Sequence, residues 1–423
     1  MLAHISQTKL RPVNLKSKLP KRIQKYASFG IFPKIILTPF AILTVAVFIA
    51  LRPFVKVQVY KVHDWRIGHF ATNTELRRLA DLSHNANQNM KHLTIYYFGS
   101  KTSSNQFLTR FWKRILPSVS GHWGWMLNEI SSKTSNHNST SSSTNIDLES
   151  LLSNSTIPNF FSDDEQIEGN NFIEKHCSQS KFVCLNVRDS EYLNQIRGRN
   201  FDHHNYRDSD IKSYIAAAET LAEMGYTVFR MGAIVKEPLV SKHPRVIDYA
   251  TNGMRSEFLD VYLGAHCTFA VSVGSGWDGI PTIFRRPMIW VNHLPIFDAS
   301  GLTLPINIFP KKLVNKNSRS LITLSDAIDK NIYDQLRTQA YLDAEVEIRD
   351  LTSEELVEAV TEMAQRVEGT FVETPEQKEM QAKLKHILST HPKLQPSPNY
   401  YPIRAQFASC FLSRYPNFLD GLD

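Results

Sequence analysis

The stretch Thr268–Asp278, TFAVSVGSGWD, decides the fold class of this 423-residue chain. Its first six residues are apolar or small, and they predict a buried β-strand over 268–273. The strand leads directly into a Gly-Ser-Gly turn at Gly274–Gly276. The pattern predicts a turn followed by a helix over residues 274–285. This order is typical of an α/β protein with a parallel sheet.

Further strand–helix units lie on both sides of this stretch. The pattern predicts strands at 182–187, 226–231, 246–249 and 288–291, with helices at 211–224 and 256–265. Four such strand runs separated by helices indicate a doubly wound sheet. Upstream, strands at 55–62 and 93–98 alternate with helices at 73–82 and 105–116. We therefore expect an α/β fold with two facing Rossmann-like domains and a cleft between them.

The composition along the chain predicts five segments. They are a basic tail with a membrane-anchoring helix (1–54), an N-terminal Rossmann-like domain (55–130), a Ser/Thr/Asn-rich linker or insertion (131–160), a C-terminal Rossmann-like domain (161–350), and C-terminal helices packing across the domains (351–423). The linker contains glycosylation sequons at Asn138 and Asn154, which matter only if this region is lumenal or extracellular.

The net charge of +7 comes from the N-terminus. Residues 1–63 hold 11 Lys or Arg and no acid, which leaves 37 basic and 41 acidic residues in the remainder. A nucleic-acid-binding protein would carry positive charge on its folded body, so we expect no nucleic-acid partner. The uncharged run Ile35–Leu51, which includes Pro39 and has basic residues on both sides, predicts membrane attachment as a single-pass or monotopic helix.

Metal and thiol chemistry have little support in the sequence. The four cysteines form no C-x-x-C pair, which excludes a zinc ribbon. Adjacent His203 and His204 lack a third ligand at metal spacing. In the Asp-Ser-Asp triplet at 208–210, Asp208 or Ser209 is better interpreted as the N-cap of the following helix. We expect neither a metal nor a cofactor.

The best candidates for a site follow the strands, because ligands of open α/β sheets bind beyond the carboxyl ends of the strands. Gly274–Gly276 offers backbone amides to a phosphate, although a plain tight turn is the alternative. Arg188 follows the strand at 182–187 and suits a diphosphate, with an ion pair to a nearby acid as the alternative. His69 follows Gly68 in the other half and could take a proton, or bond within its own loop.

An ordered set of motifs resembles a family of bacterial glycosyltransferases of GT-B type. The motifs are Arg66–Leu76 (RIGHFATNTEL), Cys184–Asp189 (CLNVRD), His204–Ile211 (HNYRDSDI), Phe229–Gly232 (FRMG), Ile247–Ala250 (IDYA), Glu257–Leu263 (EFLDVYL), Gly274–Asp278 (GSGWD), Phe284–Pro287 (FRRP) and Phe411–Asp420 (FLSRYPNFLD). The arrangement is also distantly similar to fucosyltransferases, in which a strand-terminal arginine contacts the donor phosphates, and Arg188 matches that place.

The resemblance implies a nucleotide-sugar donor on the C-terminal domain, a glycan or lipid-linked acceptor, and a role in surface polysaccharide assembly. The resulting hypothesis is a membrane-attached, metal-independent glycosyltransferase. The expected donor-binding residues are Arg188, Arg207, Arg230, Asp248, Gly274, Ser275, Gly276 and Asp278. His69 is the expected catalytic base, and Glu75 is the reserve.

Two other functions fit the same sequence. One is transfer of a different activated group, such as pyruvyl or phosphoryl, and the other is a membrane-tethered carbohydrate-binding or scaffold protein without chemistry. Location also depends on the source: a bacterial chain should have its body in the cytoplasm with the nucleotide sugars, whereas a eukaryotic chain would have a lumenal body behind a type II anchor.

Overall fold

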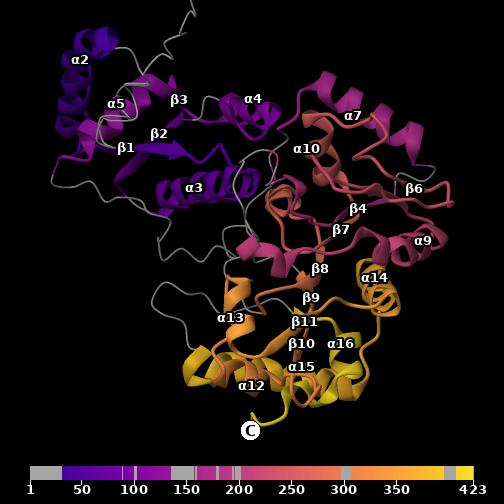
Figure 1. Ribbon diagram of the computed structural model, residues 1–423. Coiled ribbons are helices and arrows are strands. Elements are labelled where there is room, and N and C mark those ends of the chain that lie inside the picture. Colours follow the sequence, from indigo (N-terminus) through magenta and orange to yellow (C-terminus); the bar gives the residue numbers. More distant parts are fainter. Residues whose placement is uncertain are drawn as a thin grey trace, which may run out of the picture.

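The computed structural model of the protein describes residues 31–87, 89–99, 102–134, 157, 160–177, 181–192, 195, 202–296, 306–394 and 406–422. They form a mixed α/β fold around two parallel sheets, one of three strands and one of seven, with a separate antiparallel pair (Figure 1). The α/β fold with parallel sheets that the sequence predicts is therefore confirmed.

The smaller sheet has the order β1 (Val55–Val62), β2 (Lys91–Phe98), β3 (Ser118–Val119), and all its pairs are parallel. The crossovers are α3 (Ile67–Asn87) and α4 (Gln106–Ile115), since parallel neighbouring strands need a connection that returns along the sheet. Asn105 begins α4 by accepting a hydrogen bond from the Leu108 amide at 2.7 Å. On the other face of the sheet, Val59 and Tyr97 pack in a cluster with α2 (Ile31–Ala50) and α5 (Gly121–Ser131).

The larger sheet has the order β12-β9-β8-β7-β4-β5-β6. Its strands are β4 (Phe182–Asn186), β5 (Thr227–Arg230), β6 (Val246–Ile247), β7 (Phe269–Ser272), β8 (Met288–His293), β9 (Ile306–Pro310) and β12 (Gln406–Phe407). All its pairs are parallel. Such a sheet buries both faces, so its strands are mostly apolar runs and do not alternate between apolar and polar residues.

Helices cover both faces of this sheet, and alternate residues of β4 divide between the two layers. Val183 and Leu185 share a core with α9 (Ile215–Glu223) and α14 (Ser353–Glu368). Phe182 and Cys184 share a second core with α7 (Asp163–His176) and α10 (Glu257–His266). That second core also takes in residues of α3 and α4, so the two sheets are joined by a common apolar layer.

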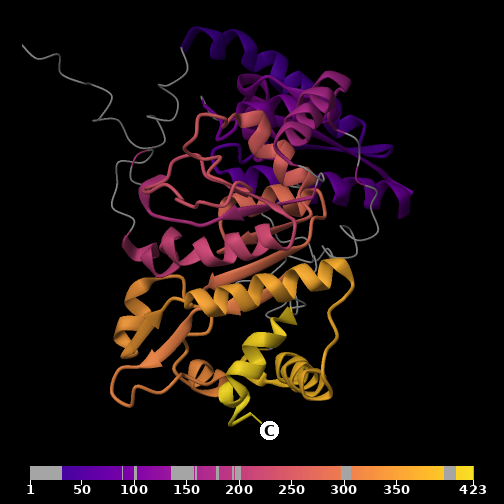
Figure 2. The same ribbon diagram turned by 90° about the vertical axis from the view of Figure 1, so that its right-hand side faces the viewer.

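The remaining elements are short or lie in the C-terminal third. They are η2 (Asp202–Arg207), η3 (Ile211–Tyr214), η4 (Gly276–Asp278), α11 (Gly279–Ile283), β10 (Lys312–Asn315), α12 (Leu324–Asp329), α13 (Thr338–Asp343), β11 (Val346–Arg349), α15 (Pro375–Thr390), η5 (Pro392–Leu394), α16 (Ser409–Arg414) and η6 (Pro416–Leu419). In Figure 2 the C-terminal helices (orange to yellow) lie at the opposite end of the molecule from the smaller sheet (indigo).

Several sequence-based expectations differ from the structure. The helix predicted from residue 73 begins at Ile67, so Gly68 and His69 lie in its first turn rather than in a loop. The N-cap before the helix predicted at 211–224 is Asp210, not Asp208 or Ser209. The C-terminal helix α14 packs on α9, β7 and β8 of the larger sheet instead of crossing both halves. The sequons at Asn138 and Asn154 lie outside the described residues.

The apolar run Ile35–Leu51 forms most of α2, which has Pro39 inside it. Within the described part of the chain, no helix reaches the combined length and hydropathy required to cross a membrane.

The packing of α7 on α10 predicts a sensitive position at Gly169. A Cβ atom there would overlap the ring of Tyr262, whereas a Cβ at exposed Gly99 would meet only the flexible end of Lys61. We expect Gly169→Ala to lower the free energy of unfolding by about 1–3 kcal/mol through overpacking, which exceeds the gain of up to ~1 kcal/mol that alanine brings to a helix. Gly99→Ala should change it little. Urea denaturation of both variants measures the difference, and equal midpoints would contradict the packing described.

Candidate functional site

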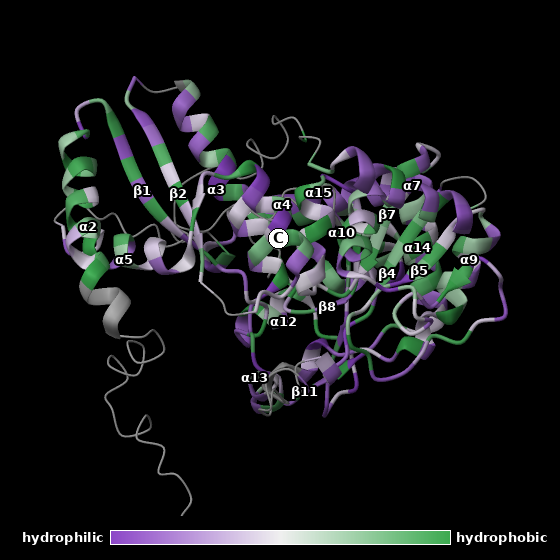
Figure 3. Ribbon diagram, turned by 90° about the horizontal axis from the view of Figure 1, so that it is seen from above, coloured by the Kyte–Doolittle hydropathy of each residue, from purple (hydrophilic) through white to green (hydrophobic). Residues whose placement is uncertain are grey.

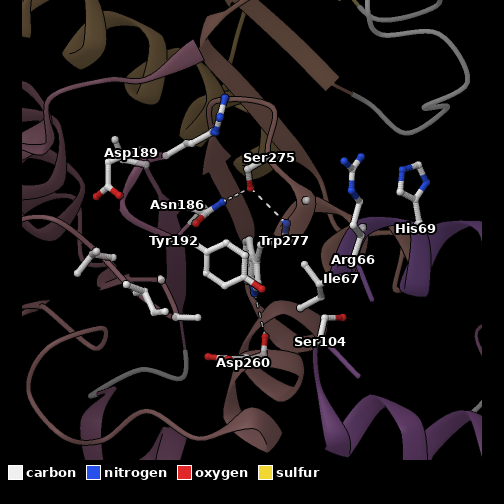
Figure 4. A pocket seen from close by; sticks show the side chains of 18 of the residues that line it. Arg66, Ile67, His69, Ser104, Asn186, Asp189, Tyr192, Asp260, Ser275 and Trp277 are labelled. Carbon is white, nitrogen blue, oxygen red and sulfur yellow. Dashed lines mark hydrogen bonds between the residues drawn. The ribbon is translucent and has the colours of Figure 1, made fainter. Parts of the chain in front are cut away.

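A cavity of about 500 Å³ lies where the carboxyl ends of β4, β5 and β7 face the first turn of α3. Its volume falls within the usual range for small-ligand sites. Residues of both halves line it: Arg66 and His69 come from the smaller half, and Asn186, Tyr192 and Ser275 from the larger (Figure 4). The cavity therefore occupies the position that the strand-end rule predicts for a ligand.

The structure brings five of the predicted site residues together at this cavity. Arg188, Arg207, Ser275, Gly276 and His69 all line it. Gly274 lies directly beside them, because its carbonyl oxygen accepts a hydrogen bond from the Arg207 guanidinium. Gly274 has a φ of +76°, and a Cβ there would come within 2.5 Å of the buried His293 ring, so only glycine fits the turn.

The polar groups of the Gly-Ser-Gly turn bond largely to one another and to neighbouring side chains, which the sequence does not indicate. Asp278 is buried, and its carboxylate accepts the Ser275 amide at 2.9 Å and the Ser275 hydroxyl at 3.1 Å. The Ser275 oxygen in turn accepts the Trp277 amide at 3.2 Å and the Asn186 side-chain amide at 2.5 Å. The Ser275 hydroxyl and the Asp278 carboxylate therefore hold the turn in shape: the hydroxyl donates to Asp278, and the carboxylate is occupied by the groups that donate to it.

The Gly276 amide differs from its neighbours. Within the described part of the chain it has no hydrogen-bond acceptor, and Gly276 lines the cavity. The carbonyl of the same residue meets the smaller half: a Cβ on Gly68 would lie 2.9 Å from it. The glycines of this turn thus allow the two halves to approach closely, and the Gly276 amide can donate a hydrogen bond to an anion.

The arginines give the cavity its charge. Arg66, Arg188, Arg207 and Arg255 line it, against the two carboxylates Asp189 and Asp260. Burial lowers the pKa of Arg188, and the positive charge of nearby Arg207 lowers it further. Asp208 Oδ1 lies 3.7 Å from Arg188 Nε, within ion-pair distance, and its charge opposes the lowering of the Arg188 pKa. Two partly desolvated guanidinium groups that repel each other favour an anion between them.

His69 lies on the wall formed by α3, next to Arg66 (Figure 4). Partial burial, the charge of Arg66 and nearby His63 lower its pKa, which a hydrogen bond with Asn73 partly offsets, so the neutral ring predominates at neutral pH. His69 Nδ1 is 3.3 Å from the Asn73 amide nitrogen. The Asn73 amide nitrogen donates in this contact and Nδ1 accepts, so uptake of a proton at Nδ1 requires the Asn73 side chain to release the ring.

Sequence reasoning missed other lining residues. Asn186 ends a strand that is buried throughout, so a polar residue at that position was an available signal. Arg255 and Asp260 form an ion pair at 2.6 Å on the cavity wall, and burial raises the pKa of Asp260 to about 6. Arg255 comes from a loop and Asp260 from α10; Asp260 lies within the Glu257–Leu263 motif, but the motif does not indicate that this side chain faces a cavity.

Five predicted residues do not line the cavity: Gly274 and Asp278, which belong to the turn described above, and Arg230, Asp248 and Glu75. Arg230 is buried and pairs with Asp248 at 3.2 Å, while Asp248 also accepts the Leu239 amide at 3.0 Å. Glu75 is fully buried between Arg78 at 2.7 Å and Arg285 at 2.9 Å. These groups pair with one another inside the protein, away from the lining of the cavity.

The described residues contain no group of three or more His, Cys, Asp or Glu arranged to hold a metal ion. The side chains of Asp202, His203 and His204 lie outside those that the structure describes.

Comparison with known proteins gives one structural match to report. No family model matches the sequence, and no curated protein matches it. Among solved structures, the chain is similar to the ADP-heptose lps heptosyltransferase II of E. coli, with a TM-score of 0.36 and 10% identity. The match covers 74% of this chain and 99% of that one.

Because the Arg230–Asp248 pair is buried, we expect its disruption to lower the stability of the protein and not only its affinity for a ligand. Asp248→Ala leaves a buried guanidinium without its carboxylate, so we expect the free energy of unfolding to fall by about 3–5 kcal/mol. The control is Asp329→Ala, which breaks the exposed ion pair with Lys393 and should cost at most about 1 kcal/mol. Urea denaturation measures both. If the Asp248→Ala protein were as stable as the wild type but bound its ligand less tightly, Asp248 would have to be assigned to the binding site.

Proposed function

We propose that this chain is a membrane-associated glycosyltransferase of GT-B architecture. It transfers a sugar from a nucleotide-sugar donor to an acceptor hydroxyl, in the biosynthesis of a surface polysaccharide or another glycan. The supporting observation is the cavity between the two halves, where Arg188, Arg207 and Gly276 line a space of ligand size. An excess of arginine over carboxylate suits a diphosphate, and the position is the one at which open α/β sheets bind ligands.

The proposed reaction uses the two walls of the cavity differently. The acceptor oxygen forms a bond to the anomeric carbon of the donor sugar, while the bond from that carbon to the diphosphate oxygen breaks. The diphosphate leaves with the electron pair, and the guanidinium groups of Arg188 and Arg207 stabilise its growing negative charge. The proton of the acceptor hydroxyl passes to neutral His69 on the opposite wall.

Arg188→Ala tests the donor site. Hydrogen bonds to charged groups contribute roughly 1.5–3 kcal/mol, so we expect the affinity for the nucleotide sugar to fall at least about tenfold. Arg188→Lys should recover only part of it, because lysine lacks the planar fork. Arg319→Ala, which removes an exposed arginine paired with Glu347, is the control.

The measurement is a thermal-shift screen of the wild-type protein with GDP-, UDP-, ADP- and CMP-linked sugars, followed by calorimetry and an assay of released nucleotide. A nucleotide sugar that stabilises the wild type and the Arg319 variant but not the Arg188 variant supports the proposal. Glycan binding without any nucleotide binding would favour the carbohydrate-binding alternative. Full turnover by Arg188→Ala would falsify the assignment of the donor site.

The pH profile tests His69. A base must be unprotonated, and the pKa of His69 lies below its ordinary value of about 6.5. We therefore expect kcat/KM to be constant near neutral pH and to fall as the pH drops through this lowered pKa. Asn73→Asp places a carboxylate beside the ring, raises its pKa and should move the acid limb to higher pH.

His69→Ala should lower kcat by about 10²–10⁴-fold, the usual contribution of a general base. Nucleotide affinity should change little, because His69 faces the acceptor. If the acid limb stays in place in Asn73→Asp, the base is another group.

A further inference from the structure

The helix α2 uses only one of its faces to pack on the protein. Ala41 and Val45 are buried against Met126 and Leu127 of α5, and Leu37 and Phe48 of α2 are partly buried in the same cluster. These contacts fix α2 alongside the smaller half of the molecule. Figure 3 shows it beside α5 as a mainly hydrophobic helix at the edge of the molecule.

Another face of α2 is apolar and open. Ile36, Phe40, Leu43 and Val47 are between 47% and 64% exposed, and their spacing of four, three and four residues aligns them along one side of the helix. In the turn that follows, Phe54 is 76% exposed. A contiguous row of large exposed apolar side chains is unusual on a soluble surface and marks an interaction site.

The chemistry of this face fits lipid better than a protein partner. No charged residue occurs between Lys34 and Arg52. The Thr44 hydroxyl is already bonded to the Phe40 carbonyl at 2.8 Å, so it offers little to a partner. Positive charge lies at both ends of the helix, in a region of 63 residues without a single acid. Apolar side chains between basic residues suit an anionic membrane, because the apolar groups can enter the acyl region while the basic groups meet the headgroups.

We propose that α2 docks this face into the surface of an anionic bilayer and lies in its plane while the opposite face stays packed on α5. A spanning orientation would surround the helix with lipid and separate Ala41 and Val45 from α5. In-plane docking keeps those contacts and inserts Phe40 and Leu43 at the boundary of headgroups and acyl chains. The inference specifies the membrane association in the proposed function and does not depend on the identity of the donor.

The test is flotation of the full-length chain with vesicles of phosphatidylcholine alone or with phosphatidylserine added. We expect binding to the anionic vesicles that weakens at high salt. Phe40→Ser with Leu43→Ser should reduce it about tenfold or more, because two inserted apolar side chains are lost. The matched control is Ile167→Ser with Val372→Ser, which removes two exposed apolar side chains elsewhere and should leave binding unchanged.

Orientation is measured with single nitroxide labels at Ile36, Leu43 and Ala50, which extend over about 21 Å of helix. In-plane docking predicts the same shallow depth for all three. A gradient of depth would overturn the proposal in favour of a spanning helix. So would an absence of vesicle binding, or association of two copies through this face in solution. Melting temperature and nucleotide binding, measured on the same samples, separate a failure of docking from a failure of folding or of the donor site.

Discussion

The candidate site depends on the close approach of two backbones. A Cβ on Gly68 would lie 2.9 Å from the carbonyl oxygen of Gly276, and one on Gly279 would lie 3.1 Å from the Cα of Gly68. Only glycine permits this distance. The contact brings the first turn of α3 against the end of β7, and the cavity forms beside it with residues of both halves in its walls. A larger residue at Gly68 would force the two walls apart.

The two walls of the cavity differ in their electrostatic properties. Arg188 and Arg207 concentrate positive charge where the strands of the larger sheet end, and burial prevents water from screening it fully. On the opposite wall, the charge of Arg66 helps keep His69 neutral. The same excess of arginine thus favours an anion on one side and an unprotonated imidazole on the other. A transfer reaction with a charged leaving group needs both.

The sequence predicted five of the seven strands of the larger sheet, because strands buried on both faces are continuous apolar runs between turn residues, but it did not predict β9 and β12. It placed Arg188 and the Gly274–Gly276 turn at the right edge for the same reason. It could not show that Asp278 and Ser275 bond to each other, since a strand end does not reveal which way a side chain turns. Arg230 illustrates this: it also ends a strand, but its guanidinium turns inward to Asp248.

The N-terminal helix shows a second limit of hydropathy. An uncharged apolar run has the same sequence pattern whether lipid surrounds the helix or the protein covers part of it, because hydropathy does not identify what the apolar side chains contact. In the structure the small residue Ala41 allows α2 to approach α5, while the larger Phe40 and Leu43 remain outside. In the chain, α2 is followed by β1 and then by α3, which carries His69. A bilayer bound to the open face of α2 would therefore lie next to this half of the molecule. For the glycosyltransferase proposed above, that arrangement would favour an acceptor presented at a membrane surface, such as a lipid-linked glycan, over one that diffuses freely.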